Sequence, residues 1–234
     1  MIPRSGIRGS ILMKKILVVA PHADDETLGC GGTILKHLSQ GDQVHWLLVT
    51  NISNSVGWSD QQVERRQIEI KKIKNMYGFH SLFMLDFGAA KLDSLIFSEI
   101  IKKINTVISE LKPQVIYLNS RNDIHTDHQI TFKAVMSCTK SFRHQYIKRI
   151  LMYETLSETE YSPPFPENQF APNVYIDISN YFDKKCLIMS EYKSEIMEKP
   201  LPRSISTLEA LAKYRGSRIG VEYAEAFQLL YEKL

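Results

Sequence analysis

Two short segments of this chain combine histidine and aspartate in a way that could hold a metal ion and hydrolyse a bond. They lie at residues 21–26 and 122–128. Imidazole and carboxylate ligands together suit Zn²⁺ and its neighbours in the first-row series. A catalytic zinc site takes three protein ligands and keeps a position open for water. His22, Asp25 and His128 would supply such a set.

The other polar residues of the two segments predict acid–base chemistry. Zinc lowers the pKa of a bound water to about 7, so a neighbouring carboxylate can accept its proton at neutral pH. We expect Asp24 to be that general base. His125 would face it, either as an imidazolium that stabilises an oxyanion or as the acid that protonates a leaving amine. Asp127 or Asp123 would hold the tautomer of His125 and raise its pKa.

The elements that must position these segments indicate an α/β fold. Short β-branched runs alternate with longer amphipathic runs, which is typical of βαβ units and a mostly parallel central sheet. The expected architecture is a Rossmann-like three-layer sandwich. Strands are predicted at residues 16–20, 43–50, 82–87, 115–119, 150–155 and 174–178. Helices are predicted at residues 33–38, 60–77, 95–111, 129–137, 184–193 and 208–215.

The two histidine–aspartate segments follow the first and the fourth predicted strands. Ligands of an open parallel sheet bind beyond the carboxyl ends of its strands, so both segments should face one crevice. Asp24 or Asp25 alone would be explained as a helix cap. Capping needs no histidines, however, and two such segments at one edge of a sheet favour a metal site.

The composition is typical of a soluble globular protein, with 44% hydrophobic and 24% charged residues. A formal net charge of +3 does not support a nucleic-acid partner. Three cysteines without a CxxC pair favour a reducing, cytoplasmic setting. No apolar run predicts a signal peptide or a transmembrane segment. We expect a disordered tail at residues 1–13 and one domain at residues 14–234, and a homo-oligomer is left open.

Taken together, the motifs resemble one known family. Pro-His-x-Asp-Asp-Glu followed much later by His-x-Asp-His resembles the LmbE-like, or PIG-L, deacetylases. The helix that carries Arg66 and Glu69 and ends at Tyr77 and Gly78 resembles the family's Arg-x-x-Glu helix. Residues 220–227 resemble its closing Gly-x-x-Tyr-Ala-Glu-x-Phe signature. Matches in this order extend over most of the chain.

The resemblance implies a Zn²⁺-dependent enzyme that removes the N-acetyl group of a glucosamine-type sugar. Family members are similar in acting on lipid-linked inositol sugars, thiol precursors, glycopeptide antibiotics and chitin oligomers. The expected partner is therefore a small N-acetylated sugar or a glycoconjugate. By resemblance, the zinc ligands are His22, Asp25 and His128, the general base is Asp24, the charged histidine is His125 and the substrate-contacting arginine is Arg66.

Three positions depart from the family pattern. Ala23 and Thr126 replace prolines, which should loosen the two loops slightly without removing a ligand. Some members carry a tyrosine two residues before the first histidine of the second motif, where it helps to bind the oxyanion. That position is Asp123 here, which makes it a candidate substrate-binding residue, and Tyr223 is a candidate for the missing tyrosine.

The main prediction is an amidohydrolase, and two alternatives stay open. One is a metal-binding module without catalysis, and the other is a deacylase for another small N-acyl group such as formyl. A nucleotide-dependent oxidoreductase is disfavoured because Gly29, Gly31 and Gly32 lack the GxGxxG spacing and Asn51 replaces the expected acidic residue. The glycines instead predict tight packing of a helix on the sheet.

Overall fold

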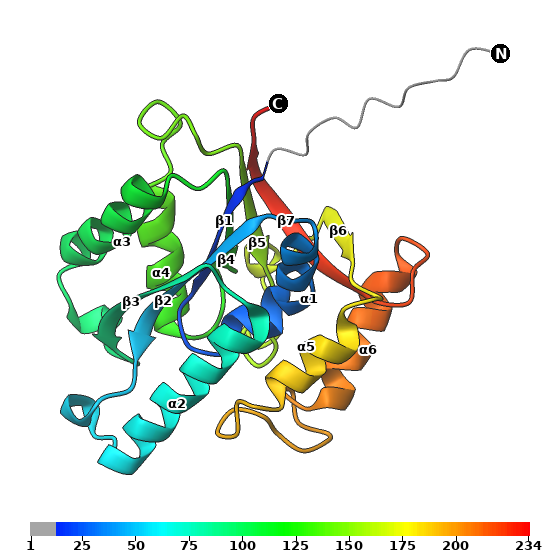
Figure 1. The fold of residues 1–234 in the computed structure, drawn as a ribbon, viewed down its shortest axis with the longest axis horizontal. Coiled ribbons are helices and arrows are strands. Elements are labelled where there is room, and N and C mark those ends of the chain that lie inside the picture. Colours follow the sequence, from blue (N-terminus) through cyan, green and yellow to red (C-terminus); the bar gives the residue numbers. More distant parts are fainter. Residues whose placement is uncertain (1–12) are drawn as a thin grey trace.

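The computed structural model describes residues 13–234, in which strands and helices alternate (Figure 1). The predicted tail thus lies outside the described residues, apart from Met13. The strands are β1 (Lys15–Ala20), β2 (Gln43–Asn51), β3 (Ser81–Gly88), β4 (Val115–Asn119), β5 (Arg149–Tyr153), β6 (Val174–Asp177) and β7 (Ala224–Glu232). The α-helices are α1 (Asp25–Ser39), α2 (Asp60–Tyr77), α3 (Phe97–Leu111), α4 (Thr126–Ser137), α5 (Phe182–Met189) and α6 (Ile205–Ser217). Short 3₁₀ helices are η1 (Asn54–Val56), η2 (Leu92–Ser94) and η3 (Pro166–Asn168).

The strands form one seven-stranded sheet in the order β3-β2-β1-β4-β5-β7-β6. Strands β1 to β5 pair in parallel, whereas β7 is antiparallel to both β5 and β6. The predicted α/β class and mostly parallel sheet are confirmed. Strand β7 was not predicted, because its sequence AEAFQLLYE is rich in residues that favour helices. Its strand conformation depends on hydrogen bonds with β5 and β6, which are distant in sequence.

The helices cover both faces of the sheet (Figure 1). Side chains of β1 alternate between two hydrophobic clusters: Ile16 and Val18 face the layer of α1, α2, α5 and α6, and Leu17 and Val19 face α3 and α4. Burial on both faces explains why this strand is a continuous apolar run. Among residues 13–234, no helix combines the length and apolarity that crossing a membrane would require.

Helix α1 begins at Asp25, inside the first motif, and not at the predicted residue 33. The glycines lower the helix propensity of its first half, which hid this part of the helix from sequence analysis. Their tight packing is confirmed, since a Cβ atom on Gly29 would overlap the ring of Tyr153 and one on Gly32 would lie 2.7 Å from Ile178. The backbone leaves helical geometry at Cys30, which kinks the helix.

The strand order reverses between β1 and β4, where one half of the parallel sheet continues through β2 and the other through β5. Open α/β sheets bind ligands at such a switch point, beyond the carboxyl ends of the strands. The motif at residues 21–26 follows β1 and the motif at residues 122–128 follows β4. The fold therefore brings the two motifs to the same point.

Candidate metal centre and active site

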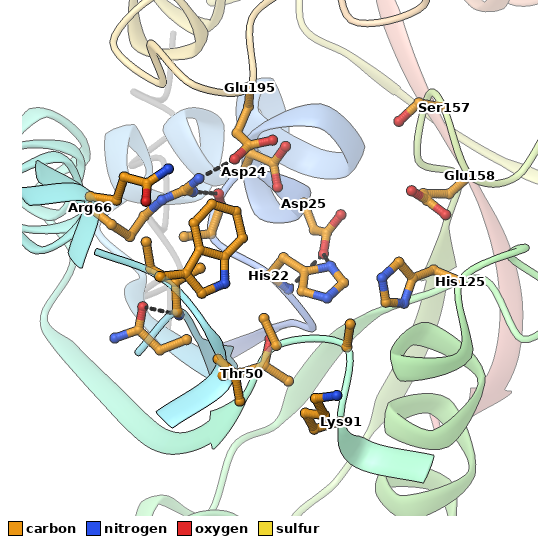
Figure 2. A pocket seen from close by; sticks show the side chains of 18 of the residues that line it. His22, Asp24, Asp25, Thr50, Arg66, Lys91, His125, Ser157, Glu158 and Glu195 are labelled. Carbon is orange, nitrogen blue, oxygen red and sulfur yellow. Dashed lines mark hydrogen bonds and ion pairs between the residues drawn. The ribbon is translucent and has the colours of Figure 1, made fainter. Parts of the chain in front are cut away.

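A cleft of about 680 Å³ opens at this edge of the sheet (Figure 2). Its walls come from the segments that follow β1, β2, β3, β4 and β5, together with α2 and the loop between α5 and α6. His22, Asp24 and Asp25 line its floor, and His125 and Arg66 lie on its sides. Five parallel strands thus contribute one loop each to a single site.

Three atoms at the cleft form a triangle suited to a metal ion. Nδ1 of His22 lies 3.2 Å from Nε2 of His128 and 3.6 Å from Oδ2 of Asp25, and the latter two atoms are 3.2 Å apart. Tetrahedral ligands roughly 2 Å from zinc are about 3.3 Å from one another. The predicted convergence of His22, Asp25 and His128 is therefore confirmed, and their atom types and spacing fit a divalent metal ion.

Each of the two histidines in the triangle is held from behind by a buried aspartate. Nε2–H of His22 donates a hydrogen bond to Asp127 at 3.0 Å, and Nδ1–H of His128 donates to Asp123 at 2.8 Å. Both imidazoles thus direct their other ring nitrogen toward Asp25. Burial opposes the charged form of His22, but hydrogen bonds with Asp127 and Asp25 raise its pKa to about 9, so a metal ion would take the place of a proton here. Burial alone would raise the pKa of Asp25, but the charge of His128 and hydrogen bonds with both imidazoles lower it, which keeps this carboxylate ionised.

Of the two predicted partners of His125, Asp127 contacts its ring, through the backbone N–H and not through the carboxylate. The carboxylates of Asp123 and Asp127 bind the metal-facing histidines, and neither forms a hydrogen bond with the ring of His125. Asp127 also accepts hydrogen bonds from the backbone N–H groups of Ala90 and Leu92. It is fully buried and does not line the cleft, so it positions His22 and is not the catalytic residue that the sequence predicted.

The surroundings of His125 favour the neutral form of its ring. Burial, together with the charge of His22, lowers the pKa of His125 to about 4. Its Nδ1 accepts a hydrogen bond from the backbone N–H of Asp127 at 3.1 Å. This contact leaves the proton of the neutral ring on Nε2, so Nε2–H is free to donate a hydrogen bond into the cleft, and the predicted imidazolium stays a prediction.

Asp24 is buried next to the triangle and is held by its surroundings. Its backbone φ of 148° lies in a region that non-glycine residues rarely adopt, and such strain is concentrated at functional sites. The backbone N–H of Asp24 donates to Glu26 at 3.2 Å, and the hydroxyl of Tyr192 donates to the same carboxylate at 2.6 Å. Burial raises the pKa of Asp24, and the neighbouring charge of Asp25 raises it further.

Arg66 extends from α2 into the wall of the cleft, where it binds protein groups. Its guanidinium donates to the carbonyl of Ala23 at 2.7 Å and to the hydroxyl of Ser194 at 2.9 Å. It also forms an ion pair with Glu195. Arg66 thus ties the first motif to the loop between α5 and α6, and its predicted contact with substrate stays a prediction.

The two other predicted substrate-binding residues do not reach the cleft. Asp123 is fully buried behind His128, so no substrate can contact it. Tyr223 lies outside the cleft, where its ring stacks on Phe182 with the centroids 4.1 Å apart. Its hydroxyl donates to Glu209 at 3.4 Å. Both predictions are wrong, because the position of these residues depends on tertiary packing that their motifs do not describe.

The sequence predicts that the loops around residues 51–59, 87–93 and 157–172 determine specificity, but it names none of the individual residues that close the cleft from above. Ser157 and Glu158 follow β5, and Glu195 and Arg203 belong to the loop between α5 and α6 (Figure 2 labels all but the arginine). For Glu158, the sequence indicated only that it follows a predicted parallel strand. The loop between α5 and α6 carries no recognisable motif. Arg203 donates through Nε to the backbone carbonyl of Glu195 at 2.9 Å.

Comparison with protein families gives one match over more than half of the chain. Residues 17–139 match the family model "PIG-L: GlcNAc-PI de-N-acetylase". This segment includes both histidine–aspartate motifs.

Two named relatives are similar to this chain over most of its length. A diacetylchitobiose deacetylase of Thermococcus kodakarensis is 27% identical over 93% of this chain and 84% of its own. A probable N-acetyl-alpha-D-glucosaminyl L-malate deacetylase 2 of Bacillus cereus is 25% identical over 78% of this chain and 84% of its own. The names of both relatives describe removal of an acetyl group.

Solved structures share the fold over nearly the whole chain. The conserved protein TT1542 of Thermus thermophilus has a TM-score of 0.75 at 25% identity, covering 95% of this chain and 97% of that one. GalB, a 4-carboxy-2-hydroxymuconate hydratase of Pseudomonas putida, has a TM-score of 0.71 at 18% identity, covering 95% and 98%. Since a hydratase shares this fold, the reaction has to be argued from the site.

Proposed function

This chain belongs to the PIG-L family of deacetylases, hydrolases of amide C–N bonds, and on that premise we propose that it removes the N-acetyl group of an amino sugar or an amino-sugar conjugate. The observation that carries the proposal is the triangle of His22, Asp25 and His128 at the floor of the cleft, with one buried aspartate behind each histidine. The names of the two relatives, which specify diacetylchitobiose and an N-acetylglucosaminyl malate, support an N-acetylated sugar as substrate.

We further propose that the three residues of the triangle hold Zn²⁺. Two imidazole nitrogens and one carboxylate oxygen form the donor set of many catalytic zinc sites, and hydrogen bonds from histidine to carboxylate commonly support such ligands. When bound, zinc would polarise the amide carbonyl. It would also lower the pKa of its bound water to about 7, so that this water could lose a proton at neutral pH.

In the proposed mechanism, Asp24 acts as the base and then as the acid. It accepts a proton from water as the water oxygen forms a bond to the amide carbon. Nε2–H of His125 donates a hydrogen bond to the former carbonyl oxygen, which carries negative charge at that stage. The C–N bond then breaks as Asp24 returns the proton to nitrogen, which yields a free amine and acetic acid, and the acid ionises to acetate.

The proposal is tested with zinc-loaded protein and a panel of N-acetylated and N-formylated amino sugars. We expect acetate release from at least one N-acetylated sugar. Asp24→Asn should lower kcat by about 10²–10⁴-fold, because it removes the base, while the zinc content measured by mass spectrometry stays at one per chain. Asp93→Asn, an exposed carboxylate on η2, is the matched control and should keep full activity.

Three outcomes would contradict the proposal. Wild-type activity in Asp24→Asn would show that the base is wrong. Faster release of formate than of acetate would favour a deformylase. Bound zinc without cleavage of any amide would favour a metal-binding module.

A further inference from the structure

Glu158 lies in a turn that is hydrogen-bonded to the second motif at two points. The hydroxyl of Thr159 donates to Asp123, the residue that holds His128, at 2.7 Å. The backbone N–H of Ile124, in the second motif, donates to the carbonyl of Glu158 at 3.2 Å. The preceding Ser157 has a φ of 73°, a left-handed conformation that directs the chain into the cleft wall. The position of Glu158 is therefore fixed through the backbone and through Thr159.

The carboxylate of Glu158 has no role in holding this turn. Within the part of the chain that the structure describes, its Oε2 is buried and has no hydrogen-bond partner. The side chain lines the cleft, and Figure 2 shows it beside His125, on the opposite side of the cleft from Arg66. A buried acceptor without a donor is unfavourable, so a rotation of this side chain that brings Oε2 to a donor on a ligand in the cleft would be favourable.

The surroundings of Glu158 place it close to the reacting groups. Burial raises the pKa of Glu158, the charge of His128 lowers it, and the charge of Asp25 raises it. The carboxylate lines the same cleft as His22, Asp25 and His125 and does not belong to the triangle. A substrate whose amide reaches His125 would bring its neighbouring atoms to Glu158.

We propose that Glu158 is a specificity-determining residue that accepts a hydrogen bond from a sugar hydroxyl adjacent to the acylated nitrogen. The inference rests on the proposed function, because an amino sugar carries such a hydroxyl at the carbon next to the amide. Hydrogen bonds to an ionised acceptor are short and strong, and a site built around one discriminates against analogues that lack the donor. Glu158 thereby selects sugar amides over simple amides.

The test compares Glu158→Gln and Glu158→Ala with wild type on two substrates, N-acetylglucosamine and its 3-deoxy analogue. On N-acetylglucosamine, kcat/KM should fall roughly 10- to 100-fold in Glu158→Ala, mainly through KM, and less in Glu158→Gln, which keeps an acceptor oxygen. On the 3-deoxy analogue, both variants should match wild type, because the hydrogen bond is absent in every case. Glu167→Gln, an exposed residue of η3, is the charge-matched control.

A purely structural role would lower activity equally on both substrates, so an equal loss overturns the inference. Equal activity of the variants and wild type on N-acetylglucosamine overturns it as well, while the proposed function survives. Wild-type protein without activity on any N-acetylated sugar would overturn the proposed function and this inference together. Zinc content and melting temperature of Glu158→Gln establish that the comparison is made on folded, metal-loaded protein.

Discussion

Asp123 and Asp127 illustrate how a carboxylate can act on chemistry that it never touches. Each binds the outer nitrogen of one metal-facing imidazole, which fixes the tautomer and turns the other nitrogen toward the triangle. Asp127 is itself oriented by two backbone N–H groups at residues 90 and 92. Rigid support of this kind lets His22 and His128 hold their positions before any ion arrives.

Removing one of these supports should weaken metal binding. We expect Asp123→Ala to lower the affinity for Zn²⁺ by about 10- to 100-fold, because the ring of His128 would lose its orienting acceptor. Competition with a chromophoric chelator measures this affinity. Asp93→Ala, which removes an exposed carboxylate, should leave it unchanged. Equal affinities in both variants would mean that backbone packing alone orients His128.

At the scale of elements, the approach of α1 to β5 decides where the first motif lies. Gly29 places the helix against the ring of Tyr153, whose hydroxyl donates to the carbonyl of Val19 in β1 at 2.8 Å. Asp25, at the start of the same helix, belongs to the metal triangle. A shift of α1 away from the sheet would therefore move a ligand as well as loosen the core.

A methyl group at this contact should be costly. We expect Gly29→Ala to lower the free energy of unfolding by about 1–3 kcal/mol, because the added Cβ overlaps a ring that is itself fully buried. Urea denaturation gives the value. Gln40→Ala, at the exposed end of the same helix, should stay within about 0.5 kcal/mol of wild type. A stable Gly29→Ala protein would show that α1 can move off the sheet without loss of packing.

At the scale of the whole molecule, Glu225 connects the last part of the chain to the first. Its carboxylate accepts hydrogen bonds from the backbone N–H groups of Gly32 and Thr33, just beyond the kink of α1, at 2.9 and 2.7 Å. It also forms a buried ion pair with Lys185 of α5 at 2.7 Å. One side chain of β7 thus satisfies donors on two helices that lie on the same face of the sheet.

Loss of this carboxylate should destabilise the entire fold. Glu225→Ala is expected to cost about 3–5 kcal/mol of unfolding free energy, because the buried ammonium of Lys185 would lose its counter-ion. The measurement is again urea denaturation, with Glu222→Ala as an exposed control three residues earlier. Should the two variants unfold at the same urea concentration, Lys185 would have to find a new partner or lose its proton.

The sequence by itself determined the parallel half of the sheet and the metal-facing residues. Strands such as β1 are recognisable because burial on both faces demands a continuous apolar run, which is a local property. His22, Asp25 and His128 were recognisable because their residue types are rare at the end of a strand without a metal and because two motifs followed two parallel strands. The family resemblance rested on the same residues.

Only the tertiary structure decided which other side chains meet around the site and where the last strand lies. Strand β7 has a sequence that favours a helix and is held in the sheet by β5 and β6. Asp123 turned out to hold His128, Tyr223 to pack on Phe182, and Glu158 to enter the cleft. The physical reason is the same in each case: partners distant in sequence are chosen by packing and hydrogen bonding between elements, and no local spacing of residues records that choice.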